Sequence, residues 1–359
     1  MEALTELRGT LPLSKRVTRG NANQIHDVTI FDVADEAGVS YATVSRVINN
    51  KDHVSIEKRE RVLHAMAQLG YVANAQARSL AGGSSHVVGL LVDYLNTSYM
   101  GEIIRGIDVA LDAHHCNLML YTTHRRKTKE SAYVTKLTRE LADGLLLILP
   151  RNVNAYLDTL RQRHFPHVLI DYLSDGGNVP SVSTTNFQGA YDAVAYLLTL
   201  GHRRIGFITG TMDFGCSQER LAGYGAALKD HGVPVEPQLI CEGNFLQPQG
   251  YQCTQTLLDL VEAPTAIFAS NDVMAMGVME AARERGLRLP EDLSIVGFDD
   301  IPQAGHVHPL LTTVRQPLEE MGRAAALLLL KYIAQPDAEI ERIKLPTELI
   351  IRQSCQPPR

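Results

Sequence analysis

The sequence predicts a chain of two parts, a small all-α segment near the N-terminus and a much larger α/β region. Residues 29–80 show helical periodicity and capping residues without a strand pattern. From residue 86 onward, apolar runs typical of buried strands alternate with helical stretches, which indicates parallel sheets covered on both faces. The length of 359 residues suits two or three domains at about 100–200 residues each.

Short helices account for the first part. Thr29 is a candidate N-cap, Asp32 can complete a capping box, and Gly38 ends the first helix. Ser40 is expected to cap a second helix that extends to residue 48, and Ser55 a third. Two helices joined by a three-residue turn with glycine are typical of a DNA-binding helix-turn-helix.

The segments that flank these helices are less regular. Residues 1–27 lack periodicity and are expected to form a disordered tail. Residues 75–80 suit a hinge helix that is marginal alone, since isolated helices below about 12–15 residues are unstable in water. The expected parts are therefore a tail, a helix-turn-helix domain, a hinge helix with linker, and an α/β domain, over residues 1–27, 28–73, 74–85 and 86–359.

Seven apolar runs and five helical stretches can be identified in the α/β region. Strands are expected at residues 87–92, 118–121, 145–149, 168–170, 205–208, 266–269 and 293–296. Helices are expected at residues 100–113, 130–142, 187–200, 220–231 and 272–285. These units fit either one large sheet or two Rossmann-like lobes. Ligands of such folds bind beyond the carboxyl ends of the strands, where Asp93, Asp171, Asn271, Asp299 and Asp300 stand.

Charge is spread unevenly along the chain. Residues 40–80 contain six Lys and Arg against three Asp and Glu, whereas the whole chain has a formal net charge of −6. A basic segment attached to an acidic body is typical of a nucleic-acid-binding module, although a solvated helix face has the same pattern.

The composition also indicates the cellular compartment of the protein. No apolar run reaches the about 18 residues of a membrane span, and residues 1–27 lack the apolar core of a signal peptide. The five cysteines are widely spaced and contain no CxxC, so reduced thiols are expected. We therefore expect a cytoplasmic protein without membrane contact.

Ordered motifs extend over nearly the whole chain. In the helical part they occupy residues 28–34, 37–40, 43–49, 53–55, 69–71 and 77–81. In the α/β part they include Gly-His-Arg-Arg-Ile at 201–205, Arg-Leu-Ala-Gly-Tyr at 220–224, Ser-Asn-Asp at 270–272, Ser-Ile-Val-Gly-Phe-Asp-Asp at 294–300 and Leu-Thr-Thr-Val-Arg-Gln-Pro at 311–317. This set strongly resembles the LacI/GalR family of bacterial transcription repressors.

The resemblance implies a homodimer on a near-palindromic operator, with the second helix in the major groove. Base contacts are expected from Tyr41, Ala42 and Arg46. A bidentate contact from Arg46 to guanine would contribute about 1–3 kcal/mol of discrimination between bases. Leu80 is expected to insert into the minor groove, or alternatively to pack on the partner's hinge helix. Phosphate contacts are expected from Thr29, Ser40, Thr43, Ser45, Asn49, His53 and Ser55.

The resemblance also implies a periplasmic-binding-protein-like effector domain whose two lobes close on a small molecule. The effector-binding residues expected from motif position are Tyr99, Met100, Asp171, Arg220, Phe245, Asn271, Asp299 and Gln316. Asp, Asn and Arg side chains can bracket vicinal hydroxyls, and Phe245 can stack on a sugar ring, so a sugar is favoured. Structural roles are the alternative for these residues, such as a helix cap for Asp299, an ion pair for Arg220 and core packing for Phe245.

Other functions are less well supported. The sequence lacks GxSxG, GxxxxGK[ST] and HExxH motifs, and no GxGxxG follows the first strand, so neither enzymatic activity nor a cofactor is expected. His114–Cys116 and the pair His306 and His308 are better explained as a helix end and a loop than as metal ligands. A nucleobase or a protein co-regulator is an alternative effector. A more distant alternative is that the chain itself is a sugar-binding protein or an enzyme. The direction of control stays open.

Overall fold

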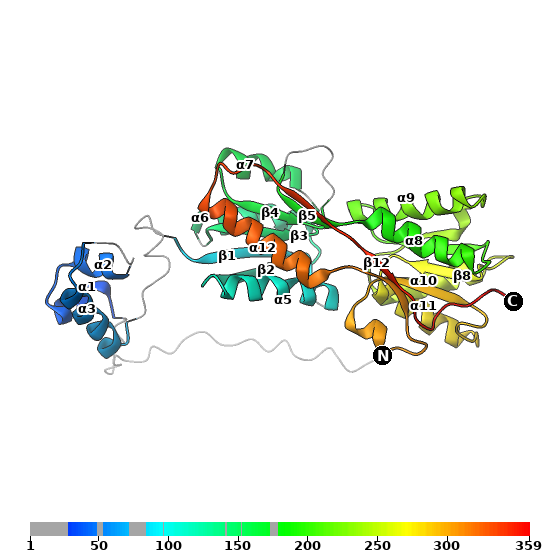
Figure 1. Ribbon diagram of the computed structural model, residues 1–359, viewed down its shortest axis with the longest axis horizontal. Coiled ribbons are helices and arrows are strands. Elements are labelled where there is room, and N and C mark those ends of the chain that lie inside the picture. The colour runs from blue at the N-terminus through cyan, green and yellow to red at the C-terminus, as the bar shows by residue number, and fades with distance from the viewer. Residues whose placement is uncertain are drawn as a thin grey trace, which may run out of the picture. The chain divides into compact units, whose positions relative to one another are not determined.

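The computed structural model describes residues 28–48, 53–71, 84–95, 97–140, 142–151, 153–172 and 179–359. The chain divides into two compact units, Met1–Gly83 and Ser84–Arg359. Figure 1 shows the helical elements of the first unit and the sheets and helices of the second. The expected tail, Asn49, Leu80 and nearly all of the expected hinge segment lie outside the described residues.

The first unit is a three-helix domain, formed by α1 (Ile30–Ala37), α2 (Tyr41–Ile48) and α3 (Ile56–Leu69). The capping box at Thr29 is confirmed, because Thr29 and Asp32 bond to each other's backbone N–H groups. Gly38 and Gly70 end α1 and α3 in the left-handed conformation that glycine adopts readily. The core joins all three helices and consists of Val33, Ala34, Ala37, Val44, Val47, Val62 and Ala65.

The second unit contains two lobes, each built on a six-stranded sheet. In the first lobe the strand order is β11-β5-β4-β3-β1-β2, and every pair is parallel. Its strands are β1 (Val87–Val92), β2 (Asn117–Thr122), β3 (Gly144–Ile148), β4 (His167–Ile170), β5 (Ser181–Thr184) and β11 (Arg342–Leu345). Its helices are α5 (Ser98–Asp112), α6 (Lys127–Glu140), the short η1 (Val153–Ala155), α7 (Leu157–Gln162) and α12 (Leu318–Ala334).

In the second lobe the strand order is β12-β10-β9-β8-β6-β7, and only the β10–β12 pair is antiparallel. Its strands are β6 (Ile205–Thr209), β7 (Ile240–Glu242), β8 (Ala266–Ala269), β9 (Ser294–Asp299), β10 (Thr312–Arg315) and β12 (Glu348–Ile350). Its helices are α8 (Asn186–Thr199), α9 (Gly215–Asp230), η2 (Pro237–Leu239), α10 (Gln247–Leu258), α11 (Asp272–Glu284) and η3 (Pro302–Gly305). Two lobes, and not one large sheet, are therefore confirmed.

Helices cover both faces of each sheet, as the near-continuous apolar strands predict. In the first lobe, Leu146 and Ile148 of β3 face α5 and α12, whereas Leu145 and Leu147 face α6 and α7. In the second lobe, α8 and α9 cover one face, and α10 and α11 cover the other. Burial on both faces removes the alternation of polar and apolar residues that an exposed face would impose.

The chain crosses between the lobes three times, after β5, after β10 and after β11. Side chains at these crossings bond to one another. Thr184 Oγ1 donates to Gln316 Oε1 at 2.6 Å, and Thr347 N–H donates to Thr185 Oγ1 at 2.9 Å. These bonds fasten the crossing segments together directly beside the cleft between the lobes.

Helices α5 and α12 pack backbone to backbone in the first lobe. A Cβ atom added at Gly322 would lie 2.0 Å from the carbonyl oxygen of Ile103, and one at Gly106 would lie 1.9 Å from that of Glu319. Neither separation is possible for real atoms, so glycine is required at both positions for the helices to approach this closely.

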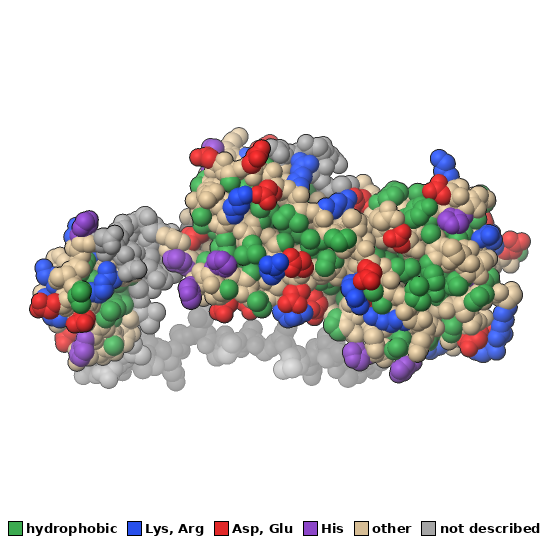
Figure 2. All heavy atoms as spheres, in the orientation of Figure 1, with side chains coloured by type: hydrophobic (Ala, Val, Ile, Leu, Met, Phe, Trp, Pro, Cys, Tyr) green, Lys and Arg blue, Asp and Glu red, His purple; other side chains and the backbone are tan. Residues whose placement is uncertain are grey.

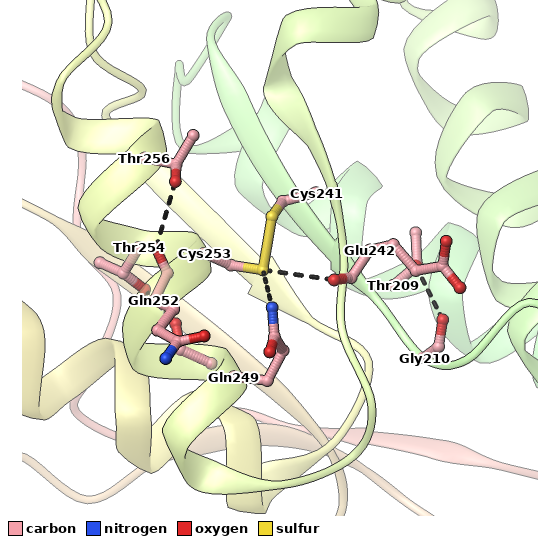
Figure 3. Close-up of a disulfide and its surroundings, with 10 residues drawn as sticks. Thr209, Gly210, Cys241, Glu242, Gln249, Gln252, Cys253, Thr254 and Thr256 are labelled. Atoms are coloured by element: carbon pink, nitrogen blue, oxygen red, sulfur yellow. Dashed lines mark hydrogen bonds between the residues drawn. A yellow bond between two sulfur atoms is a disulfide. The ribbon is translucent and has the colours of Figure 1, made fainter.

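The expectation that all cysteines are reduced is wrong for one pair. Cys241 of β7 and Cys253 of α10 form a disulfide with a Cα–Cα distance of 5.8 Å (Figure 3). The separation of 12 residues gives no motif, and only the packing of α10 against the sheet edge brings the two Cα atoms within disulfide range. Cys116, Cys216 and Cys355 are free thiols.

Candidate functional sites

The exposed side of α2 carries the residues expected to contact bases. Tyr41, Ala42 and Arg46 are all exposed, whereas Val44 and Val47 are buried against α1 and α3. The ring of Tyr41 stacks on Phe31 of α1 with a centroid distance of 5.2 Å, which fixes the tyrosine at the start of the helix. Figure 2 shows Lys, Arg and His side chains scattered over the surface of this unit. The structure thus leaves one polar helix face available for a groove.

Residues expected at phosphates gather at the starts of helices. The backbone N–H and the hydroxyl of Thr29 each donate to Asp32 Oδ2 at 2.7 Å. Ser40 Oγ accepts from the N–H of Thr43 at 3.3 Å and lies 3.0 Å from the Thr43 hydroxyl. Ser55 stands at the N-cap position of α3, but in the described structure its side chain makes no capping bond, so the expected cap is wrong in that detail.

The remaining phosphate candidates differ in setting. Ser45 is half-buried on α2. His53 is exposed and has a backbone φ of 75°, a value that residues other than glycine rarely adopt. Asn49 and the minor-groove candidate Leu80 lie outside the described residues.

Between the lobes of the second unit lies a small cavity, called the inner cavity below. Asp171 follows β4, Asn271 follows β8 and Asp299 ends β9, so the cavity lies at the carboxyl ends of the strands, as this class of fold predicts. Six of the eight expected effector residues line it, namely Tyr99, Asp171, Arg220, Phe245, Asn271 and Asp299.

Arg220 of α9 is the most tightly held of these side chains and is 2% exposed. Its Nε donates to Asn186 Oδ1 at 2.9 Å, and its Nη1 donates to the carbonyl oxygen of Ser270 at 2.5 Å. The guanidinium carbon lies 3.8 Å from the centroid of the Phe298 ring, and Nη1 lies 4.0 Å from Asp299 Oδ1. A guanidinium fixed in this way presents its remaining donors in one orientation.

Asp171 and Tyr99 form the facing wall. Tyr99 donates its hydroxyl to Asp171 Oδ2 at 2.9 Å, and Asn186 Nδ2 donates to Asp171 Oδ1 at 3.3 Å. Asn186 therefore connects the carboxylate of one wall to Arg220 of the other. Burial, together with the Asp171 charge, raises the pKa of the Tyr99 hydroxyl well above its ordinary value. The Tyr99 hydroxyl therefore keeps its proton at neutral pH.

Asp299 titrates in an unusual range. Burial raises the pKa of its carboxyl group to about 7, although Arg220 and a bond from Gln316 favour the charged form. Gln316 Nε2 donates to Asp299 Oδ1 at 2.8 Å. Gln316 does not line the cavity, although it bonds to Asp299, which does. Met100 is also absent from the lining, because this residue of α5 is fully buried in the core of the first lobe.

Backbone strain concentrates at this cavity. Leu149, Asp171, Phe245 and Asp299 have φ values of 48°, 53°, 65° and 112°, in a region that non-glycine residues rarely occupy. Such conformations cost about 1–3 kcal/mol each and persist only where the surrounding structure imposes them. Their clustering around one cavity supports a binding role for it.

Four lining residues were not predicted, Tyr94, Thr97, Leu149 and Cys216. Tyr94 and Leu149 immediately follow Asp93 and β3, so their position beyond a strand end is a signal that sequence reasoning had available. Thr97 Oγ1 is buried without a hydrogen-bond partner among the described residues, which leaves a polar group for a ligand. Burial raises the pKa of the Cys216 thiol, so it lines the cavity as a neutral group.

A second, outer cavity shares Asp171 with the inner one. Its lining includes Arg151, Asp213 and Phe214. Arg151 donates through Nη2 to the buried Asp93 at 2.9 Å, and its guanidinium carbon lies 4.7 Å from the centroid of the Phe214 ring in the other lobe.

Another arginine also reaches across the cleft. Arg125, from the first lobe, donates through Nη2 to the carbonyl oxygen of Asn244 in the second lobe at 2.8 Å. Its guanidinium carbon lies 4.4 Å from the centroid of the Tyr94 ring, which lines the inner cavity. The two arginines hold the lobes together at the cleft in this conformation.

Two further classes of site were searched for in the described part of the chain. No group of three or more His, Cys, Asp or Glu side chains there is placed to hold a metal ion. His114 follows α5 and contacts the carbonyl oxygen of Ala110 through Nδ1 at 2.9 Å. None of the described helices has the length and apolar character needed to cross a membrane.

Family models match segments of both units. Residues 29–74 match the model of bacterial regulatory proteins of the lacI family, and residues 194–355 match a periplasmic binding protein-like domain. Catabolite control protein A of Priestia megaterium is 35% identical over 331 residues, which cover 92% of this chain and all of that protein.

Solved structures give the same result over the whole fold. The lac repressor dimer bound to operator and the anti-inducer ONPF is 30% identical, with a TM-score of 0.81 over 92% of this chain and 99% of that one. A complex of the transcriptional regulator CelR with cellobiose is 33% identical, with a TM-score of 0.72 over 91% of this chain and 100% of that one. The chain therefore belongs to the LacI family of bacterial regulatory proteins.

Proposed function

We propose that this chain is a cytoplasmic, homodimeric transcriptional repressor whose affinity for a near-palindromic operator is controlled by a neutral sugar bound between its two lobes. The DNA-binding part of the proposal follows from family membership and from the exposed face of α2. The choice of effector depends on the inner cavity. The cellobiose complex of the CelR relative supports a sugar as the class of ligand.

The single observation that carries the effector class is the chemistry of the inner cavity. Asp171 and Asp299 supply oxygen acceptors, and Arg220 supplies donors in a fixed plane. Neighbouring hydroxyls of a sugar can bond to such paired groups at the same time. Asn271 caps α11 by accepting from the N–H of Met274 at 2.9 Å, and its Nδ2 donates to the carbonyl oxygen of Phe245 at 3.2 Å. The ring of Phe245 adds an apolar surface for the C–H face of a sugar. A ligand with hydroxyls around an apolar ring can bond to the carboxyl and guanidinium groups and stack on Phe245.

Charge distinguishes a neutral sugar from a sugar phosphate. The inner cavity holds the carboxyl groups of Asp171 and Asp299 against the one guanidinium of Arg220, which already lies 4.0 Å from Asp299. With a pKa of about 7, Asp299 gains its full negative charge only above neutral pH. A phosphate or a uronic acid would place further negative charge beside Asp171 and Asp299 in a poorly solvated site, which is unfavourable. Hydroxyl groups donate hydrogen bonds to carboxylates and carry no such penalty.

A homodimer is consistent with the surface of the first lobe. Val109 of α5 is 56% exposed, and Leu327 and Leu330 of α12 are only half-buried. Figure 2 shows hydrophobic side chains over the area that α12 crosses. Apolar surface of this kind suits contact with a second copy. The lac repressor relative is itself described as a dimer on its operator.

Thermal melts against a panel of neutral sugars, sugar phosphates and nucleobases test the effector class. The chain contains no tryptophan, so circular dichroism is the suitable probe. A ligand at 100 times its dissociation constant is expected to stabilise the second unit by about 2.7 kcal/mol. Asp171→Asn should weaken the stabilisation by the sugar, whereas the exposed control Asp112→Asn should not.

The outcomes separate the candidate effectors. Stabilisation by a neutral sugar that depends on Asp171 supports the proposal. Stabilisation by a nucleobase alone would overturn the choice of a sugar, and stronger stabilisation by a sugar phosphate would overturn the charge argument. Either result would leave the DNA-binding function in place.

A further inference from the structure

We propose that Cys241 and Cys253 form a reversible thiol–disulfide site, through which a low-molecular-weight thiol such as glutathione controls the Phe245 wall of the inner cavity and hence effector affinity. This inference rests on the sugar-controlled cytoplasmic repressor proposed above. It goes beyond that proposal because it assigns a chemical modification site to the second lobe and makes effector binding depend on the redox state of the cell.

The compartment gives the first argument. Glutathione and thioredoxin keep cytoplasmic thiols reduced, so a disulfide in that compartment is usually transient and either catalytic or redox-sensing. The structure brings Cys241 and Cys253 to a Cα–Cα distance of 5.8 Å, whereas the other three cysteines are free thiols (Figure 3). A repressor has no catalytic use for such a pair, and redox sensing is the role that fits.

The pair brackets the segment that forms one wall of the inner cavity. Cys241 lies in β7, Cys253 lies in α10, and the cavity-lining Phe245 stands on the segment between them. On the same segment, the carbonyl oxygen of Asn244 accepts the 2.8 Å bond from Arg125 of the other lobe. The disulfide therefore closes a loop that carries both a cavity wall and a contact across the cleft.

The two ends of this segment are held unequally. α10 packs closely on α11, because a Cβ added at Gly250 would lie 2.3 Å from the carbonyl oxygen of Met274. β7, in contrast, is a three-residue strand at the edge of its sheet, where it pairs with β6. The disulfide ties this edge strand to a firmly held helix, so we expect its reduction to free mainly the β7 end of the segment.

The backbone of Phe245 depends on such constraints. Its φ of 65° lies in a region that residues other than glycine rarely occupy, and such a conformation persists only where the surrounding structure imposes it. Asn271 Nδ2 supplies one constraint by donating to the carbonyl oxygen of Phe245 at 3.2 Å, and the disulfide supplies another through β7. Without the disulfide, ligand binding must restore this conformation from a larger set, and affinity falls.

The exchange reaction consumes two molecules of reduced glutathione. Cys241 is half-buried and Cys253 is 1% exposed, so the first glutathione thiolate attacks Cys241 Sγ. The bond between the two cysteines breaks, and the electron pair leaves on Cys253 Sγ, to which Gln249 Nε2 donates at 3.8 Å (Figure 3). A second glutathione thiolate then attacks the glutathione sulfur of the mixed disulfide and releases the Cys241 thiolate. The protein gains two electrons and two protons, glutathione disulfide forms, and the reverse sequence oxidises the pair.

Titration of the full-length protein in glutathione buffers tests the site. At each ratio of reduced to oxidised glutathione, the thiols are alkylated with N-ethylmaleimide in denaturant and counted by mass spectrometry. Wild-type protein is expected to change reversibly between three and five alkylated thiols per chain. The double variant Cys241→Ser/Cys253→Ser should show no transition. Cys116→Ser, which removes a half-buried free thiol, is the matched control and should keep it.

Two further measurements connect the site to the cleft. Hydrogen–deuterium exchange of the ligand-free wild type should be faster over residues 242–252 in the reduced state and unchanged over residues 87–92 of the other lobe. Calorimetry uses glucose, galactose, ribose, cellobiose and maltose as probes, and the oxidised protein should bind a sugar at least threefold more tightly than the reduced protein. By linkage, saturation with that sugar should shift by the same factor the ratio of squared reduced glutathione to glutathione disulfide at the midpoint.

Each contrary result has a distinct meaning. A pair that stays in one state at every glutathione ratio overturns the site. Equal exchange over residues 242–252 in the two states, or equal dissociation constants for a bound sugar, overturns the link to the cleft and leaves the sugar-controlled repressor standing. If no sugar of the panel binds in either state, the failure lies with the proposed effector, and the titration and the exchange data then decide whether the pair controls the Phe245 wall.

Discussion

Replacing Asp299 with asparagine is expected to make the second unit more stable while weakening its ligand site. The carboxyl group is 3% exposed, and burial is the main cause that raises its pKa from 3.8 to about 7. Asparagine has the same shape and keeps an oxygen that can accept the 2.8 Å bond from Gln316. The substitution therefore removes the ionisable group with little change in packing.

The magnitude follows from linkage between proton binding and folding. The folded state holds the proton more tightly than the unfolded state, so this carboxyl group stabilises least when both states are ionised. The wild-type protein therefore loses stability relative to the Asp299→Asn variant as pH rises from 3.8 to about 7, at about 1.4 kcal/mol per pH unit. The variant should exceed the wild type by about 2 kcal/mol at pH 5 and by about 4 kcal/mol at pH 8.

Urea unfolding followed by circular dichroism at pH 5 and pH 8 measures this difference. The exposed control Asp112→Asn should change the free energy of unfolding by no more than about 0.5 kcal/mol at either pH. The reasoning is refuted if Asp299→Asn is less stable than the wild type at pH 8. It is also refuted if the difference between the two proteins is the same at both pH values.

Three further predictions concern packing, the disulfide and DNA. Gly322→Ala should lower the free energy of unfolding of the second unit in urea by at least about 1–3 kcal/mol, because the new Cβ would lie 2.0 Å from a backbone oxygen. The control Gly305→Ala should have little effect, because its Cβ would meet no neighbouring atom within 4 Å. Reduction of the Cys241–Cys253 disulfide, which closes a loop with a sequence separation of 12, should lower the free energy of unfolding by about 3 kcal/mol, and the double Cys→Ser variant should not respond to reductant. Arg46→Ala should weaken operator binding by about 1–3 kcal/mol, measured by fluorescence anisotropy. The melting temperature should not change, because Arg46 is exposed. An unaltered operator affinity would exclude a base contact by Arg46.

Local signals were sufficient for most of the elements. The capping box at Thr29 and the glycines at 38 and 70 mark the ends of α1 and α3, because caps act within a single turn of chain. The seven expected strands all occur, since apolar runs between helices are a strong local pattern. Five strands were not expected. The edge strands β7, β11 and β12 are short and partly exposed, and the mostly buried interior strands β5 and β10 contain Ser and Thr residues in place of a continuous apolar run.

Long-range contacts were harder to predict. Six of the eight expected effector residues line the inner cavity because family motifs fix their places at strand ends. Gln316 and Met100 do not line it, since a motif position does not say whether a side chain points to the cavity or to the core. The pairing of Cys241 with Cys253 depends on how α10 packs beside β7, which no local pattern reveals.

Control of operator binding by the cleft is the central claim, and reciprocal titrations test it most directly. A duplex that the protein selects from a random library serves as the operator. Its dissociation constant is measured by fluorescence anisotropy with and without a saturating sugar, and that of the sugar by calorimetry with and without saturating duplex. Both should change by the same factor, between about 5-fold and 150-fold. An operator dissociation constant that does not change when the sugar saturates the cleft would contradict the account.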